Sequence, residues 1–117
     1  MNRLKDKVAL ITGASKGIGT GIATAFAADG ASVAVNYSSD RRGADRVAQS
    51  IVDGGGKAIA VGADVSRRTE VARMFREIDS AFGRLDVLVN NAGIFRFGAV
   101  EDITDAYCQA NLPRCAQ

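Results

Sequence analysis

The chain has 117 residues, a length that favours one compact domain over two. Hydrophobic residues make up 47% and charged residues 24%, the balance of a soluble globular protein, and the 15 basic and 13 acidic residues are too scattered to predict a nucleic-acid surface. Histidine is absent, which excludes an imidazole base and most zinc sites, so we expect no metal site. No apolar run is long enough to span a membrane, and we expect a cytoplasmic protein.

Four short apolar runs alternate with segments of helical periodicity along the chain. The runs, at residues 8–11, 33–35, 58–61 and 87–89, are nearly continuous, which is typical of strands buried on both faces. Between them, apolar residues recur at helical spacing in three groups: Ile18, Ile22 and Phe26; Ala44, Val47, Ala48 and Ile51; and Val71, Met74, Phe75, Ile78 and Phe82. The expected N-caps of the second and third helices are Ser39 or Asp40, and Ser66.

This alternation predicts an α/β protein built on a Rossmann-like, doubly wound parallel sheet, of which the chain holds the N-terminal half. Right-handed crossovers give the strand order 3-2-1-4 in the common form of such sheets. Ligands bind these sheets at the carboxyl ends of the strands, where the winding reverses. The loops after the first and fourth strands are therefore expected to carry the function.

A glycine-rich turn, TGASKGIG at residues 12–19, follows the first strand and leads directly into the first helix. Glycine allows a tight turn and close approach of the backbone to a pyrophosphate, and a helix N-terminus offers N–H groups with a partial charge of about +0.5. The alternative is a turn that merely starts a helix. A Walker-type P-loop is excluded because Ile18, and not Lys-Ser or Lys-Thr, follows Gly17.

The fourth strand is followed by NNAG, and the two loops together resemble the paired signatures of the short-chain dehydrogenase/reductase family. Asp64-Val65, after the third strand, resembles a third element of the family. The resemblance covers residues 5 to about 105. It predicts an incomplete dinucleotide-binding domain at residues 1–105 and a divergent tail at 106–117.

The resemblance also implies a set of residues that contact the coenzyme. The pyrophosphate and adenosine ribose would lie on the glycine turn, the adenine on the loop after strand 3, and the nicotinamide side on the loop after strand 4. The residues are, in that order, Gly13, Ser15, Lys16, Gly17, Ile18 and Gly19; Asp64 and Val65; and Asn90, Ala92 and Gly93.

The end of the second strand favours NADP(H) over NAD as the coenzyme. NAD-preferring sites usually place Asp or Glu there, whereas this chain has Tyr37 and Ser38, two further candidate contacts. In the family, a basic residue at the position of Lys16 goes with NADP. Arg41 and Arg42 follow at the expected start of the second helix, where cations are disfavoured unless an anion such as a phosphate compensates them. Two solvated surface arginines remain the alternative.

The catalytic Tyr-x-x-x-Lys of the family does not occur in this sequence, because Arg41 follows Tyr37 at the fourth position and Asn111 follows Tyr107. We therefore assign no catalytic residue and expect a chain truncated before that pair. Strand 4 would then be an exposed edge open to self-association.

The resemblance implies an NADP(H)-dependent oxidoreductase acting on a carbonyl or secondary alcohol. The segments VAVNYSSD and VNNAGI resemble the 3-oxoacyl-acyl-carrier-protein reductase branch of the family. The alternative function is that of a catalytically inactive NADP-binding module or remnant.

Overall fold

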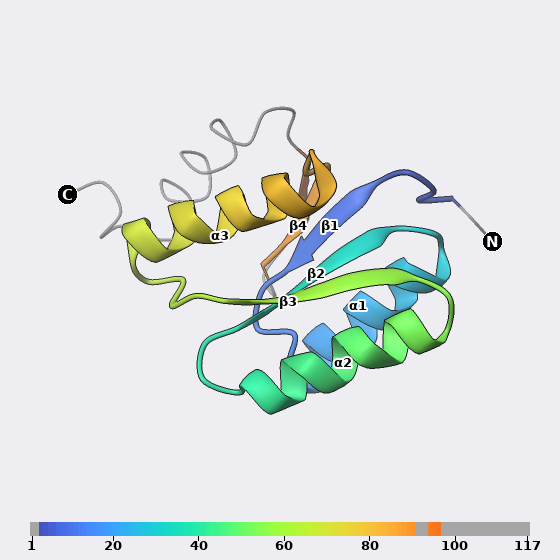
Figure 1. Ribbon diagram of the computed structural model, residues 1–117, viewed down its shortest axis with the longest axis horizontal. Coiled ribbons are helices and arrows are strands. Elements are labelled where there is room, and N and C mark those ends of the chain that lie inside the picture. Colours follow the sequence, from blue (N-terminus) through green and yellow to red (C-terminus); the bar gives the residue numbers. More distant parts are fainter. Residues whose placement is uncertain (1–2, 91–93, 97–117) are drawn as a thin grey trace.

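The computed structural model describes residues 3–90 and 94–96, which form one β-sheet with helices on both faces (Figure 1). In spatial order the strands are β3 (Lys57–Gly62), β2 (Ser32–Tyr37), β1 (Val8–Ile11), β4 (Val87–Val89) and β5 (Ile94–Arg96). The first four strands are parallel, which confirms the Rossmann-like fold and the order 3-2-1-4. The predicted tail at residues 106–117 lies outside the described residues.

The prediction that β4 forms an exposed edge is wrong. Strand β5 pairs with it in antiparallel orientation, with Val87 opposite Arg96 and Val89 opposite Ile94. The chain turns back after β4 and supplies the hydrogen-bonding partners that a sheet edge lacks. Since β1 pairs with its other side, β4 has a neighbour on both sides, and the argument for self-association through this strand no longer holds.

Two layers of helices cover the sheet, and alternation along each strand divides its side chains between them (Figure 1). The helices are α1 (Gly17–Ala28), α2 (Arg41–Asp53) and α3 (Arg68–Phe82). In β1, Val8 and Leu10 belong to the core beneath α3, whereas Ala9 and Ile11 belong to the core beneath α1 and α2. Within the described residues, no helix is both long and apolar enough to cross a membrane.

The helix ends agree in part with the predicted caps. Asp40 is the N-cap of α2, and its carboxylate accepts the N–H of Gly43 at 3.0 Å. Ser66 is not a cap, because α3 begins later, at Arg68 with Arg67 as its N-cap. The backbone N–H and hydroxyl of Ser66 instead donate to the Asp64 carboxylate.

Asp86 joins the beginnings of β1 and β4 at the end of the sheet opposite the glycine turn. Its Oδ2 accepts the N–H of Val8 at 2.9 Å, and its Oδ1 accepts the Nε–H of Arg84 at 3.0 Å. Burial alone raises the pKa of Asp86, but the hydrogen bonds from Arg84 and Val8 and the nearby positive charges lower it by more. The pKa of the folded carboxyl therefore lies below its ordinary value.

We expect Asp86→Asn to lower the free energy of unfolding by about 1–2 kcal/mol near neutral pH. A carboxyl whose pKa is lower in the folded state stabilises the fold above its unfolded pKa of about 3.9, and this contribution is lost as the pH falls through the folded pKa. The difference between the two proteins should therefore shrink in acid. Urea denaturation at a series of pH values measures it, and a difference that persists undiminished at low pH would contradict the assignment.

Candidate functional site

The parallel sheet brings the loops after β1, β2 and β3 and the residue after β4 to one edge. Strand β1 lies at the centre, between β2 and β4, and the chain leaves it for α1 on one face of the sheet. The chain leaves β3 for α3 on the opposite face. The reversal of winding therefore lies beside the glycine turn, where ligands of such sheets bind.

The backbone of the glycine turn requires glycine at the three predicted positions. Gly13 and Gly17 have φ angles of 62° and 68°, in the left-handed region that side chains disfavour. At Gly19 a Cβ would lie 2.7 Å from the carbonyl oxygen of Gly13 and 2.8 Å from the Cα of Ala14. The first turn of α1 therefore packs directly against the backbone of the turn that precedes it.

The N-terminus of α1 differs from that of its neighbour α2. Among the described residues, the N-cap Lys16 makes no side-chain capping hydrogen bond, and no acidic residue lies in the first turn of α1. In α2, by contrast, Asp40 caps the helix. Ser15 is half-buried, whereas Lys16, Gly17 and Ile18 are exposed, and 80% of the Ile18 surface is accessible. The first N–H groups of α1 thus lack the side-chain acceptor that α2 has, an arrangement suited to an external anion.

Asn90 lies next to the start of the glycine turn, as the strand order predicted. The Thr12 hydroxyl donates to Oδ1 of Asn90 at 2.9 Å, and the Thr12 N–H donates to the carbonyl oxygen of Val89 at 3.0 Å. The loops after β1 and β4 are therefore joined directly. Two further predicted contacts, Ala92 and Gly93, lie outside the described residues.

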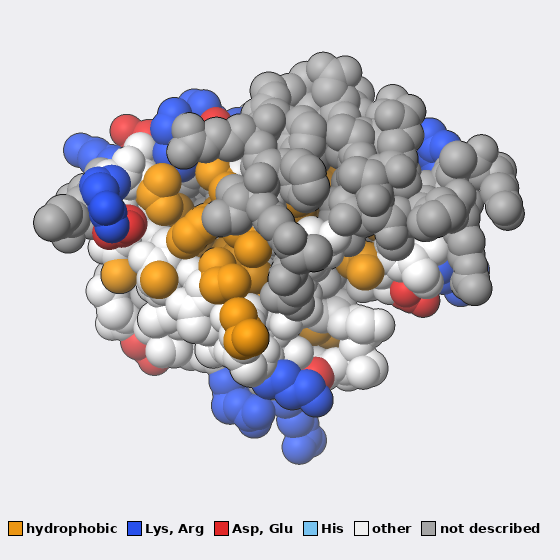
Figure 2. All heavy atoms as spheres, turned by 180° about the vertical axis from the view of Figure 1, so that it is seen from behind, with side chains coloured by type: hydrophobic (Ala, Val, Ile, Leu, Met, Phe, Trp, Pro, Cys, Tyr) orange, Lys and Arg blue, Asp and Glu red, His pale blue; other side chains and the backbone are white. Residues whose placement is uncertain are grey.

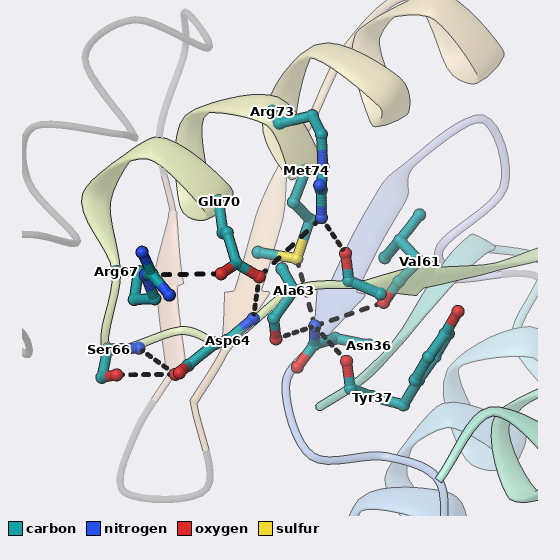
Figure 3. Close-up of polar contacts among 11 residues, drawn as sticks. Asn36, Tyr37, Val61, Ala63, Asp64, Ser66, Arg67, Glu70, Arg73 and Met74 are labelled. Carbon is teal, nitrogen blue, oxygen red and sulfur yellow. Dashed lines mark hydrogen bonds and ion pairs between the residues drawn. The ribbon is translucent and has the colours of Figure 1, made fainter. Parts of the chain in front are cut away.

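The loop after β3 forms a defined turn (Figure 3). Oδ1 of Asp64 accepts the N–H of Ser66 at 2.9 Å and its hydroxyl at 2.6 Å, while the Asp64 N–H donates to Oε1 of Glu70 at 2.9 Å. Val65 is partly buried against the core beneath α3. Contacts with Ser66 and with α3 therefore set the position of Asp64, whose Oδ1 acts as an acceptor within the turn.

Tyr37 and Ser38 lie beside this turn, at the end of β2. The carbonyl oxygen of Tyr37 accepts the N–H of Ala63 at 3.0 Å. Its ring occupies the space above Gly62, where an added Cβ would lie 2.8 Å from the Tyr37 hydroxyl oxygen. Ser38 is exposed. These two predicted residues therefore lie between the glycine turn and the turn at residues 64–66, the Asp64 turn.

Sequence reasoning missed one residue of the site, Asn36. Its side chain is buried, and its Oδ1 accepts the N–H of Gly13 at 3.2 Å. Its carbonyl oxygen accepts the N–H of Ala14 at 3.0 Å. The available signal was a single amide among the four central residues of SVAVNY, a stretch in which the other three are apolar and all four are buried.

A hollow of about 400 Å³ adjoins the glycine turn between α1 and α2, and its lining includes Ser15, Lys16, Gly17, Thr20, Gly43 and Arg46. Basic side chains gather at the lower edge of the molecule in Figure 2, where α2 begins. Arg41 is mostly exposed, and its Nε lies 3.7 Å from the Asp45 carboxylate. Lys16 and Arg46 therefore line this hollow, whereas Arg41 pairs along its own helix.

Comparison with known proteins identifies the class to which this fold and site belong. The sequence profile of the short chain dehydrogenase family matches residues 7–112, and the chain belongs to this family. An uncharacterized oxidoreductase of Methylorubrum extorquens is 52% identical over 107 residues, which are 92% of this chain and 43% of that protein. A hydroxynaphthalene reductase-like protein of Metarhizium acridum is 47% identical over 102 residues, 87% of this chain and 38% of that protein.

Solved structures agree with this assignment. A dehydrogenase/reductase from Sinorhizobium meliloti is 40% identical, with a TM-score of 0.72 over 74% of this chain and 34% of that chain. A hydroxysteroid dehydrogenase from Escherichia coli has the same identity of 40% and TM-score of 0.72, over 75% of this chain and 36% of that chain. The chain thus spans less than half the length of these relatives.

Members of the family use a nicotinamide dinucleotide, and the residues present fit one. The space that a Cβ at Gly19 would need is taken by the backbone of the turn, so the helix N-terminus and the turn form one continuous backbone surface. Such a surface is the usual cradle of a dinucleotide pyrophosphate.

Proposed function

We propose that this chain holds NADP(H) for an oxidoreductase that interconverts a carbonyl and a secondary alcohol. The observation that carries the proposal is the N-terminus of α1, which has no side-chain cap among the described residues and packs through Gly19 against the glycine turn. The names of the relatives describe reductases and dehydrogenases, which are the two directions of this reaction. The nicotinamide, when bound, supplies or accepts the hydride.

The residues proposed to hold the coenzyme come from three loops and the end of β2. The turn before α1 would bind the pyrophosphate through backbone N–H groups, and the Asp64 turn would hold the adenine. The residues after β4 would contact the coenzyme on its nicotinamide side. The proposed contacts are Gly13, Ser15, Lys16, Gly17, Ile18, Gly19, Tyr37, Ser38, Asp64, Val65, Asn90, Ala92 and Gly93.

Charge at the end of β2 supports NADP(H) over NAD. A carboxylate there would repel a 2′-phosphate, but Tyr37 and Ser38 carry no charge. The next carboxylate along the chain, that of Asp40, accepts the N–H of Gly43 as the cap of α2. Lys16 and Arg46 line the hollow beside the glycine turn and supply positive charge for a phosphate.

For the substrate we propose a 3-oxoacyl thioester as the first candidate to assay. The proposal rests on the resemblance of VAVNYSSD and VNNAGI to the 3-oxoacyl-acyl-carrier-protein reductase branch. In a protein that also supplies the Tyr-x-x-x-Lys missing from this sequence, oxidation of NADPH in the presence of such a thioester, followed by absorbance, measures this activity. Turnover of cyclic ketones in preference to the thioester would contradict this choice of substrate while leaving the coenzyme assignment intact.

Titration of the chain with NADPH and with NADH, followed by coenzyme fluorescence, tests the assignment of the coenzyme. We expect NADPH to bind more tightly, and Lys16→Ala to weaken NADPH binding by at least about tenfold while leaving NADH binding unchanged, because a charge-assisted contact to a phosphate contributes about 1.5–3 kcal/mol. Lys57→Ala is the matched control, since Lys57 begins β3 at the opposite end of the sheet and is exposed. Equal affinity for the two coenzymes, or an equal loss in both variants, would contradict the proposal.

A further inference from the structure

The side-chain amide of Asn36 lies between the glycine turn and the loop after β3. On one side, its Oδ1 accepts the N–H of Gly13 at 3.2 Å. On the other side, its Nδ2 donates to the carbonyl oxygens of Val61 at 3.3 Å and Ala63 at 3.4 Å, and lies 3.3 Å from the sulfur of Met74 (Figure 3). A single buried side chain therefore connects the glycine turn, the end of β3 and α3 across the end of β2.

These bonds use both halves of the amide. A primary amide offers an acceptor and two donors in one plane, whereas a carboxylate only accepts and a valine does neither. An apolar side chain at this position would leave the N–H of Gly13 without this partner at a partly buried position. It would also leave the buried carbonyl oxygens at the end of β3 without it, which is unfavourable. The amide of asparagine thus matches the N–H donor of one loop and the carbonyl acceptors of the other.

The two loops that Asn36 connects are those proposed to hold opposite parts of one ligand. Gly13 begins the turn proposed for the pyrophosphate, and Ala63 immediately precedes Asp64, which is proposed for the adenine. A dinucleotide that contacts both loops binds best when their separation is already set, because ordering them on binding would cost affinity. The carbonyl oxygen of Asn36 reinforces the connection, since it accepts the N–H of Ala14 at 3.0 Å.

We propose that Asn36 is a positioning residue that holds the glycine turn and the Asp64 turn at the separation needed by a dinucleotide. The inference rests on the proposed coenzyme-binding function, and it assigns Asn36 an effect on affinity without contact to the coenzyme. A second, local effect follows from the same bonds. The N–H of Gly13, which is held by Asn36, is protected from exchange with solvent.

The test compares the full chain with Asn36→Ala by NADPH titration and by hydrogen exchange of the backbone amides. We expect NADPH to bind about tenfold more weakly to the variant, because it loses the net contribution of about one hydrogen bond that holds the two loops in place. Exchange at the amide of Gly13, which loses its side-chain acceptor, should become faster. The matched control is Val33→Ala, because Val33 is fully buried in the same strand but pairs with Ala9 and Ala58, away from both loops.

Each outcome decides between positioning and simple stabilisation. Weaker binding and faster exchange in Asn36→Ala, with neither change in Val33→Ala, supports the proposal. Unchanged affinity in Asn36→Ala, or an equal loss in Val33→Ala, overturns it while leaving the proposed function standing. If the unaltered chain binds neither NADPH nor NADH, the proposed function itself is contradicted. Should Asn36→Ala not fold, the pair Asn36→Asp and Asn36→Leu, whose side chains match asparagine in length, replaces it: tighter binding by the aspartate variant, which keeps an acceptor for the N–H of Gly13, supports the role of the polar link, and equal binding overturns it.

Discussion

Replacement of Gly19 with alanine is expected to weaken NADPH binding by more than about tenfold and to lower the free energy of unfolding by about 1–3 kcal/mol. The added methyl would lie 2.7 Å from the carbonyl oxygen of Gly13 and 2.8 Å from the Cα of Ala14. Both are backbone atoms, so the methyl cannot be accommodated by the turning of a side chain. The start of α1 must move away from the glycine turn, and the surface proposed to bind the pyrophosphate is then lost.

Gly21→Ala is the matched control for this experiment. Gly21 lies in the same helix, and a Cβ built on it would meet no atom within 4 Å. In an exposed helix position alanine is more favourable than glycine by about 0.5–1 kcal/mol, so we expect a small gain in stability and unchanged affinity for NADPH. Coenzyme titration and urea denaturation of both variants measure the two quantities. Equal affinity of Gly19→Ala and Gly21→Ala would contradict the described packing at Gly19.

Replacement of Phe75 with alanine is expected to lower the free energy of unfolding by about 3–5 kcal/mol. Phe75 lies in α3 and is fully buried in the core that also contains Leu10 and Leu88. The loss combines the burial of the ring with the cavity left beneath the helix, and it is a large part of the stability of a small domain, which is about 5–15 kcal/mol. The variant should therefore be partly unfolded at moderate temperature.

Val52→Ala provides a comparison in an exposed position, since 46% of the Val52 surface is accessible. We expect its free energy of unfolding to lie within about 0.5 kcal/mol of that of the unaltered chain. Thermal and urea denaturation of the two variants measure the difference. A loss below about 1 kcal/mol in Phe75→Ala would mean that α3 does not cover the sheet as described.

The secondary structure could be predicted from the sequence because its signals are local. The apolar run at 8–11 coincides with β1, and the run at 33–35 lies inside β2, whose ends the pattern did not mark. Asp40 was one of two candidate caps, and the structure selects it through the N–H of Gly43. The Ser66 cap was wrong because the sequence does not show that its hydroxyl and N–H are already engaged by Asp64.

The candidate site was predicted through its backbone requirements and was missed where it depends on contacts between strands. Gly13, Gly17 and Gly19 are identifiable because tight turns and close packing demand glycine at those positions. Asn36 was missed because its partners are far away in the sequence, at the start of the glycine turn and at the end of β3. Strand β5 was missed for a similar reason, since its three residues pair with β4 only after the chain has turned back.

The sequence by itself determined the order of strands and helices and the glycine turn, because strand burial, helical periodicity and φ preference act over a few neighbouring residues. Only the tertiary structure decided that β4 has a partner on both sides, that Lys16 and Arg46 line one hollow, and that Asn36 links two loops. These features depend on the distances between segments that the chain itself separates by many residues. They exist only once the sheet has brought the ends of its strands to one edge.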